Sequence, residues 1–285
     1  MKKSISICMI VYNHEKYIRQ AIESVLMQEG DFDFELIISN DCSTDKTDLI
    51  IQDILSNHPQ KSIKYFSQTA NLGMMANFIF TLKKAQNKYI ALCEGDDYWT
   101  DSFKLKKQID FLESEDDYVL CFHKVNILKT DGKIVEDFIT KVPDNYESIQ
   151  TLAQKGNYIH TPSVVFRNII KDFPFEFELS PVGDYFLYML LAEKGKLKYI
   201  EETMAVYRYG VGIHSANSRI KTAKNSINFF ICLLSYLKDE ELKKYIFNRQ
   251  ITAAKYLDEL IANDKNNLFV RIIKKIKHLK KSFKI

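Results

Sequence analysis

The sequence predicts an α/β fold with a mainly parallel central sheet, and three observations support this prediction. Strand-like apolar runs alternate with helix-like periodic segments through the first hundred residues, and the connections between them are short. The chain has 285 residues, and 46% of them are hydrophobic, which is enough for a packed core. Such alternation favours right-handed βαβ units, whose strands lie parallel in one sheet.

The N-terminal part contains four predicted strands. Residues 4–11 form a nearly continuous apolar run, as expected of a strand buried on both faces. Residues 15–27 carry apolar side chains at helical spacing, and Ser43 or Thr44 can cap a helix that runs to about residue 55. The other elements predicted here are strands at 35–39, 63–67 and 89–93 and a helix at 74–85.

The middle of the chain is less regular, and its end is helical. Thr130-Asp131-Gly132 is typical of a hairpin turn between two strands. From residue 216 the pattern is helical, so we expect an α/β domain at 1–215 and a helical region at 216–285. The elements predicted in between are strands at 118–128, 133–138, 163–166, 196–200 and 204–208 and a helix at 184–193.

Polar residues cluster directly after the first four predicted strands. Ligands of parallel sheets bind beyond the carboxyl ends of the strands, so these loops describe a site on one edge of the sheet. The loops are residues 12–14, 40–45, 71–73 and 94–97.

The loop Glu94-Gly95-Asp96-Asp97 indicates a cation site. Carboxylates on one short loop repel one another unless a cation joins them, and a hard divalent ion with oxygen ligands suits them. The alternative is a helix N-terminus, where acids are also favourable. Asp101 is better placed to cap the helix that follows, so capping leaves Asp96 and Asp97 unexplained.

Asp41 follows the second predicted strand. A carboxylate there can accept hydrogen bonds from a base or ribose, although an Asx turn or a helix cap is an equally open interpretation. The chain contains neither G-x-G-x-x-G nor G-x-x-x-x-G-K-[ST]. A nucleotide bound here would therefore be held by a metal and not by a glycine cradle.

Seven segments, in this order, resemble the family 2 glycosyltransferases with the GT-A fold. The resemblance covers about residues 4–215, and its carriers are SICMIVYNHEKYIRQAIESVLMQ at 6–28, IISNDCSTDKT at 37–47, NLG at 71–73, ALCEGDDYW at 91–99, TPSVVFR at 161–167, GDYFL at 183–187 and VYR at 206–208. It implies inverting transfer of a sugar, in this case a hexose, from a nucleotide-diphosphate sugar, with a UDP-sugar as the expected donor. The implied acceptor is a hydroxyl of a glycan or lipid-linked glycan in bacterial surface polysaccharide synthesis.

The resemblance also implies roles for donor-binding residues. Val11 and Tyr12 would line the base pocket, Asp41 would bind the base, and Asn71 and Gly73 would lie near the nucleotide.

For the metal, Mn²⁺ or Mg²⁺, the resemblance implies Asp96 as the first ligand and Asp97 as the second. Glu94 stands where the family usually has Asp, and its extra methylene would place it against the ribose or a metal-bound water. His214 follows the VYR segment and would reach the metal or the diphosphate; the alternative is a histidine on a surface loop.

Asp184 matches the family's catalytic base, although Gly183 precedes it where an acid is usual. Helix capping is the alternative role for Asp184. On the acceptor side, His160 is a candidate contact, and Trp99 is a candidate apolar wall of the sugar pocket or a core residue.

Two other functions remain open at this point. A non-catalytic nucleotide- or glycan-binding module would need no base at Asp184. A sugar nucleotidyltransferase would carry a glycine-rich basic loop after the first strand, where this chain has Tyr12-Asn13-His14-Glu15.

Positive charge is concentrated at the C-terminus. The net charge is +3, but residues 268–285 hold seven Lys/Arg and no acid, which leaves 33 basic against 37 acidic residues, or −4, for the rest. The body is therefore no general nucleic-acid binder. Apolar residues recur at helical spacing within 268–285, which predicts a basic amphipathic helix that binds an anionic membrane surface or packs on protein.

The cysteine pattern bears on location. Cys8, Cys42, Cys93, Cys121 and Cys232 are scattered without a CxxC pair, and we predict neither a signal peptide nor a membrane span. We therefore expect a cytoplasmic protein, peripheral at the inner face of the cell membrane if residues 268–285 bind there.

Overall fold

The structure is a computed structural model that describes residues 3–212 and 218–263. The chain divides into two compact units, residues 1–216 and 217–285.

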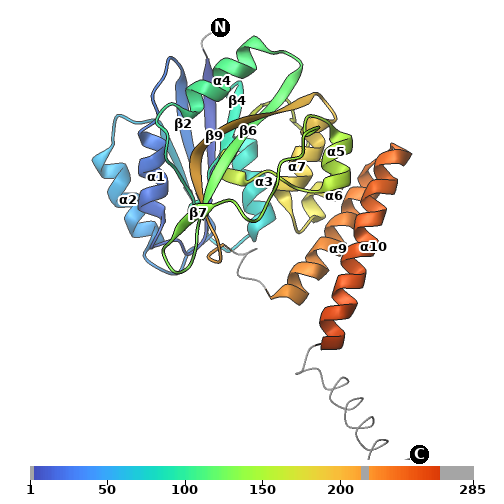
Figure 1. The fold of residues 1–285 in the computed structure, drawn as a ribbon. Helices are drawn as coiled ribbons and strands as arrows, with labels where there is room; N and C mark the ends of the chain where they lie inside the picture. Colours follow the sequence, from blue (N-terminus) through green and yellow to red (C-terminus); the bar gives the residue numbers. More distant parts are fainter. Residues whose placement is uncertain (1–2, 213–217, 264–285) are drawn as a thin grey trace, which may run out of the picture. The chain divides into compact units, whose positions relative to one another are not determined.

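Within the described residues, the first unit is built on one mixed sheet of nine strands (Figure 1). The strands are β1 (Ser4–Val11), β2 (Asp33–Asn40), β3 (Ile63–Ser67), β4 (Tyr89–Leu92), β5 (Tyr98–Trp99), β6 (Tyr118–Leu128), β7 (Ile134–Glu136), β8 (Val165–Arg167) and β9 (Lys196–Arg208). Their order is β3-β2-β1-β4-β8-β6-β9-β5, with β7 paired to β6.

Strand direction brings the functional loops to one edge. β1 pairs in parallel with β2 and β4, and β8 is antiparallel to both β4 and β6. β9 is parallel to β6. The strands β1, β2, β4, β6 and β9 therefore all end at the same edge of the sheet, where the sequence predicts the site.

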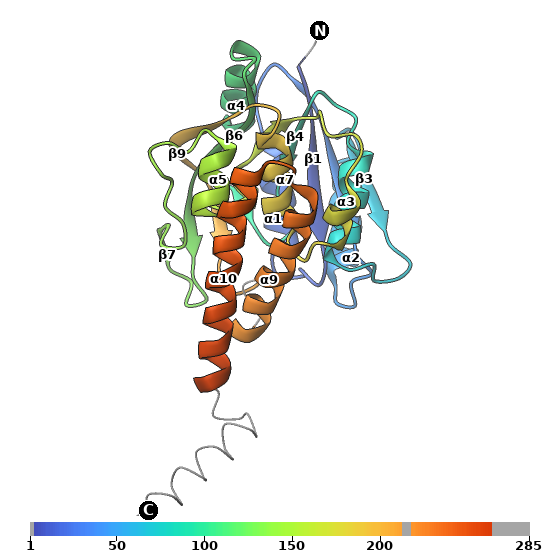
Figure 2. The same cartoon turned by 90° about the vertical axis from the view of Figure 1, so that its right-hand side faces the viewer.

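Helices cover both faces of this sheet. The helical elements are α1 (Ile18–Leu26), α2 (Thr47–Asn57), α3 (Met74–Lys84), α4 (Lys104–Ser114), α5 (Ile149–Lys155), the 3₁₀ turn η1 (Thr161–Ser163), α6 (Phe175–Leu179) and α7 (Gly183–Ala192). Because β3 connects to β4 in the opposite direction from β1 to β2, right-handed connections place α3 on the face opposite α1. The short helix α6 contacts both α3 and α7, and Figure 2 shows α3 and α7 on the face turned to the viewer.

The α/β prediction is confirmed, and several element boundaries are corrected. The helix predicted at 43–55 begins at Thr47, because the Ser43 hydroxyl donates to Asn40 Oδ1 (2.5 Å) instead of capping. The two strands predicted at 196–200 and 204–208 are one strand, β9, whose register against β6 shifts between Ile200 and Thr203. The residues of β9 at this shift have no partner in β6 and interrupt the alternation of side chains. In the sequence, such an interruption looks like the end of one strand and the start of another.

The second unit consists of α9 (Arg219–Tyr236) and α10 (Glu240–Asn263), which pack against each other. The Ser218 hydroxyl caps α9 by accepting a hydrogen bond from the Lys221 amide at 3.3 Å. Among the helices of residues 3–212 and 218–263, none combines the length and the apolar character that crossing a bilayer requires. The predicted helix at 268–285 lies outside the described residues.

A buried lysine lies at the start of α4. Lys104 is 0% exposed, and its Nζ donates to Gln108 Oε1 (2.8 Å) and lies 4.2 Å from the centre of the Trp99 ring. Gln108 Nε2 in turn donates to the carbonyls of Cys121 (2.9 Å) and Ser163 (2.8 Å). Burial lowers the Lys104 pKa from 10.5 to about 7.

This pKa shift predicts a pH-dependent stability. Between about pH 7 and 10.5 the unfolded chain holds a proton that the folded chain has released, so the free energy of unfolding rises with pH across that window. We expect the difference in this free energy between the wild type and Lys104→Met to change by up to about 1.4 kcal/mol per pH unit there. Denaturant unfolding at several pH values measures it. The exposed Lys171→Met is the control, and parallel curves for wild type and Lys104→Met would contradict the assignment.

Candidate active site

The loops after β1, β2 and β4 are in direct contact. The Gly95 amide donates to the Ile10 carbonyl (3.1 Å), and the Asp41 amide donates to the Val11 carbonyl (2.8 Å). A Cβ atom at Gly95 would lie 2.8 Å from His14 Nδ1 and 2.9 Å from Val11 Cγ2. The acidic loop therefore packs on the loop after β1 as closely as glycine allows.

Asp41 ties the loop after β3 to this group. Its Oδ1 accepts from the Leu72 amide (2.7 Å), and its Oδ2 accepts from the Gly73 amide (3.0 Å). Asn71 Nδ2 donates to the Asp41 carbonyl at 3.2 Å, and Gly73 has the positive φ of 85° that glycine favours. The structure thus brings three predicted nucleotide-binding residues together. The Asp41 carboxylate also holds the loop after β3 in place through Leu72, which is 31 residues away, and the sequence pattern does not reveal this contact.

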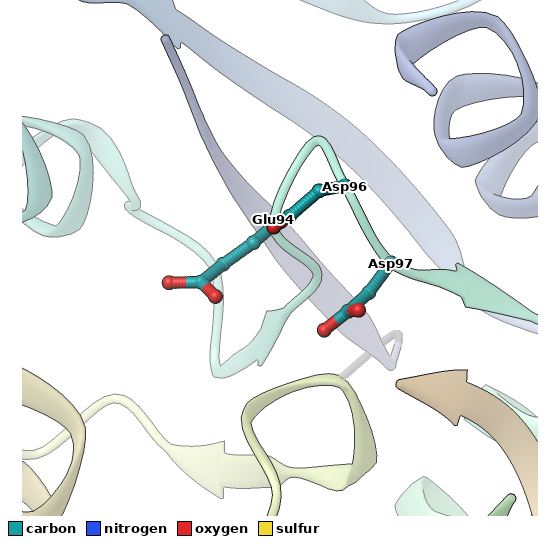
Figure 3. Close-up of side chains that lie close together, drawn as sticks. All are labelled: Glu94, Asp96 and Asp97. Carbon is teal, nitrogen blue, oxygen red and sulfur yellow. The ribbon is translucent and has the colours of Figure 1, made fainter. Parts of the chain in front are cut away.

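Three acids converge at the loop after β4 (Figure 3). One carboxylate oxygen each from Glu94, Asp96 and Asp97 lies within 4.8 Å of the others. Asp97 is 1% exposed; its Oδ1 accepts from the Arg208 amide (2.8 Å), and its buried Oδ2 has no hydrogen-bond partner. An unpartnered buried carboxylate oxygen beside two further acids is a donor set that fits a hard divalent cation.

The proximity of these acids changes their protonation. Burial, followed by the charges of Asp96 and Asp184, raises the pKa of Glu94 to about 8. Burial and the charges of Asp96 and Glu94 also raise the pKa of Asp97, while Arg208 opposes the rise. The neighbouring charges thus oppose the ionisation of Glu94 and Asp97, and a bound cation would reverse this effect.

Asp184 lies on α7, and its charge is one of the causes that raise the pKa of Glu94. It is the second residue of that helix, whose N-cap is Val182, and its Oδ2 accepts from Asn157 Nδ2 at 3.1 Å. A Cβ atom at Gly183 would lie 2.8 Å from both Met75 Sδ and Phe78 Cδ1. The close packing of α7 on α3 therefore explains why glycine stands where the family usually has an acid.

Arg208 is a residue of this site whose role the sequence pattern left undefined. It is 6% exposed, and its guanidinium donates to the Asp96 carbonyl and to Gln20 Oε1. It also lies 4.9 Å and 4.7 Å from the ring centres of Tyr17 and Tyr98. Arg208 holds the acidic loop through the main chain, which leaves the side chains of Glu94 and Asp96 directed to the site.

Two tyrosines also belong to the site. Burial and the charges of Asp97, Glu94, Asp96 and Asp184 raise the pKa of Tyr207, so its phenol stays protonated beside the acids. Burial and Asp184 raise the pKa of Tyr188, which follows Asp184 by one helical turn. In the sequence, Tyr207 could have been found from its place in the VYR segment at the end of a strand. Tyr188 could have been found only from its spacing of four residues from Asp184 on the same helix.

The structure describes the surroundings of three further predicted site residues, and a fourth cannot be placed. Trp99 is 1% exposed and donates through Nε1 to the Pro162 carbonyl (2.9 Å), so it is a core residue and no pocket wall. Val11 is 2% exposed and lies under the acidic loop, which leaves the partly exposed Tyr12 to face a base. His160 Nε2 lies 2.9 Å from Asp137 Oδ2, so this nitrogen is engaged within the protein. His214 lies outside the described residues.

The comparison with protein families agrees with this geometry. The model described as "Glycosyl transferase family 2" matches residues 6–173. This chain belongs to the family 2 glycosyltransferases. An uncharacterized protein of Mycobacterium tuberculosis is 39% identical over 214 residues, which are 74% of this chain and 61% of that protein. The chain thus spans less than two thirds of that relative's length.

Other relatives and solved structures extend the comparison. TuaG of Bacillus subtilis, named for teichuronic acid biosynthesis, is 30% identical over 138 residues, 48% of this chain and 53% of its own length. The structure of S. aureus TarS with UDP-GlcNAc has a TM-score of 0.65 at 18% identity and covers 93% of this chain and 77% of that one. The mannosyltransferase PcManGT of Pyrobaculum calidifontis, with GDP-Man and Mn²⁺, has a TM-score of 0.63 at 15% identity and covers 98% and 80%. These likenesses confirm the GT-A fold.

Proposed function

We propose that this chain is an inverting glycosyltransferase that moves a sugar from a nucleotide-diphosphate sugar to a hydroxyl of a glycan or lipid-linked glycan acceptor. The observation that supports the proposal is the cluster of Glu94, Asp96 and Asp97, with Asp184 near enough for its charge to raise the pKa of Glu94. Displacement of a nucleotide diphosphate needs a base on one side of the sugar and charge neutralisation on the other. Transfer of a hexose from a UDP-sugar is the expected case, since TarS binds UDP-GlcNAc.

The acidic cluster would hold the donor's metal. Asp96 and Asp97 would be the ligands of Mn²⁺ or Mg²⁺, with the free Oδ2 of Asp97 as one donor atom. When bound, the cation supplies positive charge for the leaving diphosphate. Glu94 would face the ribose or a metal-bound water, and Arg208 would keep the loop in place. Tyr12, Asp41, Asn71 and Gly73 would surround the base and nucleotide, and His214 would reach the metal or the diphosphate.

Asp184 would act as the base. Its carboxylate takes the proton of the acceptor hydroxyl while that oxygen bonds to the anomeric carbon, and the bond from this carbon to the diphosphate oxygen breaks. Attack from the side opposite the leaving group inverts the anomeric centre. Asn157 Nδ2 orients the carboxylate by donating to Oδ2.

A panel of nucleotide sugars tests the proposal. Each is incubated with the protein and Mn²⁺, and both the rise in melting temperature and the slow release of nucleotide diphosphate are measured. A glycosyltransferase should be stabilised by one donor and should hydrolyse it slowly. Stabilisation without any release would favour a non-catalytic binding module, and no response to any donor would contradict the proposal.

The site of action is part of the proposal. The name of TuaG points to cell-surface polysaccharide synthesis, and a lipid-linked acceptor would require a cytoplasmic enzyme to work at the inner face of the membrane. The basic residues of 268–285 would supply that attachment, at about 1 kcal/mol for each cation near an anionic surface.

Co-sedimentation with anionic liposomes measures this attachment. We expect the full chain to sediment at low salt, and a chain ending at Asn267 to remain in the supernatant. Lys274, Lys275 and Lys277 changed together to Glu keep the chain length and should also abolish sedimentation. Equal sedimentation of all three proteins would reject the membrane role without affecting the assignment of glycosyl transfer.

A further inference from the structure

A row of aromatic rings leads from the acidic cluster to the protein surface. We call this row the aromatic wall; its rings are those of His160, Tyr207, Phe138 and Tyr209. The Arg208 amide donates to Asp97 Oδ1, so Tyr207 and Tyr209 flank the peptide that touches the acids. Side chains alternate along a strand, and the Tyr209 amide continues the β9 ladder by donating to the Leu128 carbonyl (3.0 Å). Tyr207 and Tyr209 therefore share one side, opposite Arg208.

The wall consists of an inner and an outer pair of rings. The inner pair is His160 and Tyr207, with ring centres 5.1 Å apart. The outer pair is Phe138 and Tyr209, with centres 5.5 Å apart and an angle of 71° between the rings. Phe138 is 55% exposed and Tyr209 is 42% exposed, so both outer rings are accessible from solvent although they touch each other and Lys129 Nζ lies 5.2 Å from the centre of the Phe138 ring. β7 and β9 flank the end of β6, at the lower edge of the sheet in Figure 1.

A satisfied polar cluster fixes the exposed Phe138. The neighbouring Asp137 accepts from the amides of Ile139 (2.7 Å) and Thr140 (3.2 Å) and from the Thr140 hydroxyl (2.5 Å). Its Oδ2 also lies 2.9 Å from His160 Nε2. The same contact ties the outer pair to the inner pair, so the wall is a preorganised surface, which reduces the entropy cost of binding.

We propose that the aromatic wall is the acceptor subsite and binds a sugar ring of the acceptor glycan; this inference rests on the proposed function. The C–H face of a pyranose carries slight positive charge and packs on the negative faces of aromatic rings. The inner end of the wall adjoins the acidic loop, because Arg208, the neighbour of Tyr207, donates its amide to Asp97 Oδ1. The wall is thus continuous with the reacting centre at one end and open to a longer glycan at the other.

Binding of defined oligosaccharides tests the wall. The probes are chitotetraose, maltotetraose and mannotetraose, observed by saturation-transfer NMR with the full chain in the presence of UDP and Mn²⁺. Phe138→Leu and Tyr209→Leu remove a ring and keep apolar volume, and each should weaken binding about three- to tenfold. Phe138→Trp, which keeps a ring, should restore binding. Phe175→Leu, at a ring that is 68% exposed on α6, is the matched control and should bind as the wild type does.

The outcomes separate this inference from the proposed function. If the wild type hydrolyses a nucleotide sugar but binds no probe, or if the leucine variants bind as the wild type does, the acceptor subsite is wrong and glycosyl transfer stands. If no donor is bound or hydrolysed, the proposed function fails whatever the probes do. Loss of liposome sedimentation in Phe138→Leu, with probe binding intact, would assign the wall to the membrane and also overturn the inference.

Discussion

Replacing Asp96 by Asn is expected to lower sugar transfer about 10²–10³-fold and to abolish its dependence on Mn²⁺ or Mg²⁺. The amide keeps the shape of the carboxylate but not its charge, and the Asp96 carbonyl remains available to Arg208. The cation would then lose a ligand, and the developing charge on the diphosphate would lose its counter-charge. Initial rates across a metal titration measure the effect on transfer, and electron paramagnetic resonance of free Mn²⁺ measures binding without any turnover.

The matched control is Asp172→Asn, the same substitution at an exposed position. It should leave both the rate and the Mn²⁺ affinity unchanged. Full activity of the wild type in excess chelator would overturn the metal assignment. Unchanged Mn²⁺ binding in Asp96→Asn would move the first ligand to Asp97 or Glu94.

Replacing Asp184 by Asn is expected to lower transfer about 10²–10⁴-fold, because the amide cannot take the acceptor proton. The Asp184 carboxylate accepts a hydrogen bond from Asn157, and in the proposed mechanism it acts on the acceptor hydroxyl and not on the donor. We therefore expect the donor KM and the stabilisation by donor to stay close to the wild-type values. Steady-state rates at saturating donor, together with melting temperatures, make the comparison.

Asn157→Ala separates proton transfer from positioning. It removes the donor to Asp184 Oδ2 but leaves the carboxylate, so its rate should fall less than that of Asp184→Asn and its pH profile should shift. If Asp184→Asn turns over as the wild type does, or if its donor affinity collapses instead, Asp184 is not the base.

Local patterns of apolar and polar residues predicted most of the strands and helices. The apolar run at 4–11 predicted a buried strand, and β1 (Ser4–Val11) is nearly all buried because it pairs on both sides within the sheet. The acidic loop after β4 was also recognisable in the sequence, because the three acids lie within four residues and therefore stay close in any fold. The predicted start of the second helix was wrong because the Ser43 hydroxyl has other partners: it donates to Asn40 Oδ1 and accepts from the Asn13 amide, which is 30 residues away.

The sequence by itself determined the strand order along the chain, the family and the acids of the site, since periodicity, composition and short motifs are properties of neighbouring residues. Only the tertiary structure decided what surrounds those acids. Arg208 is 111 residues from Asp97, and it reaches the acidic loop because β9 pairs with β5, the strand that directly follows this loop. The same arrangement buries Trp99 in the core and places Tyr207 among the carboxylates. Contacts of this kind depend on the order of strands in the sheet, which burial of the whole core sets and no local pattern encodes.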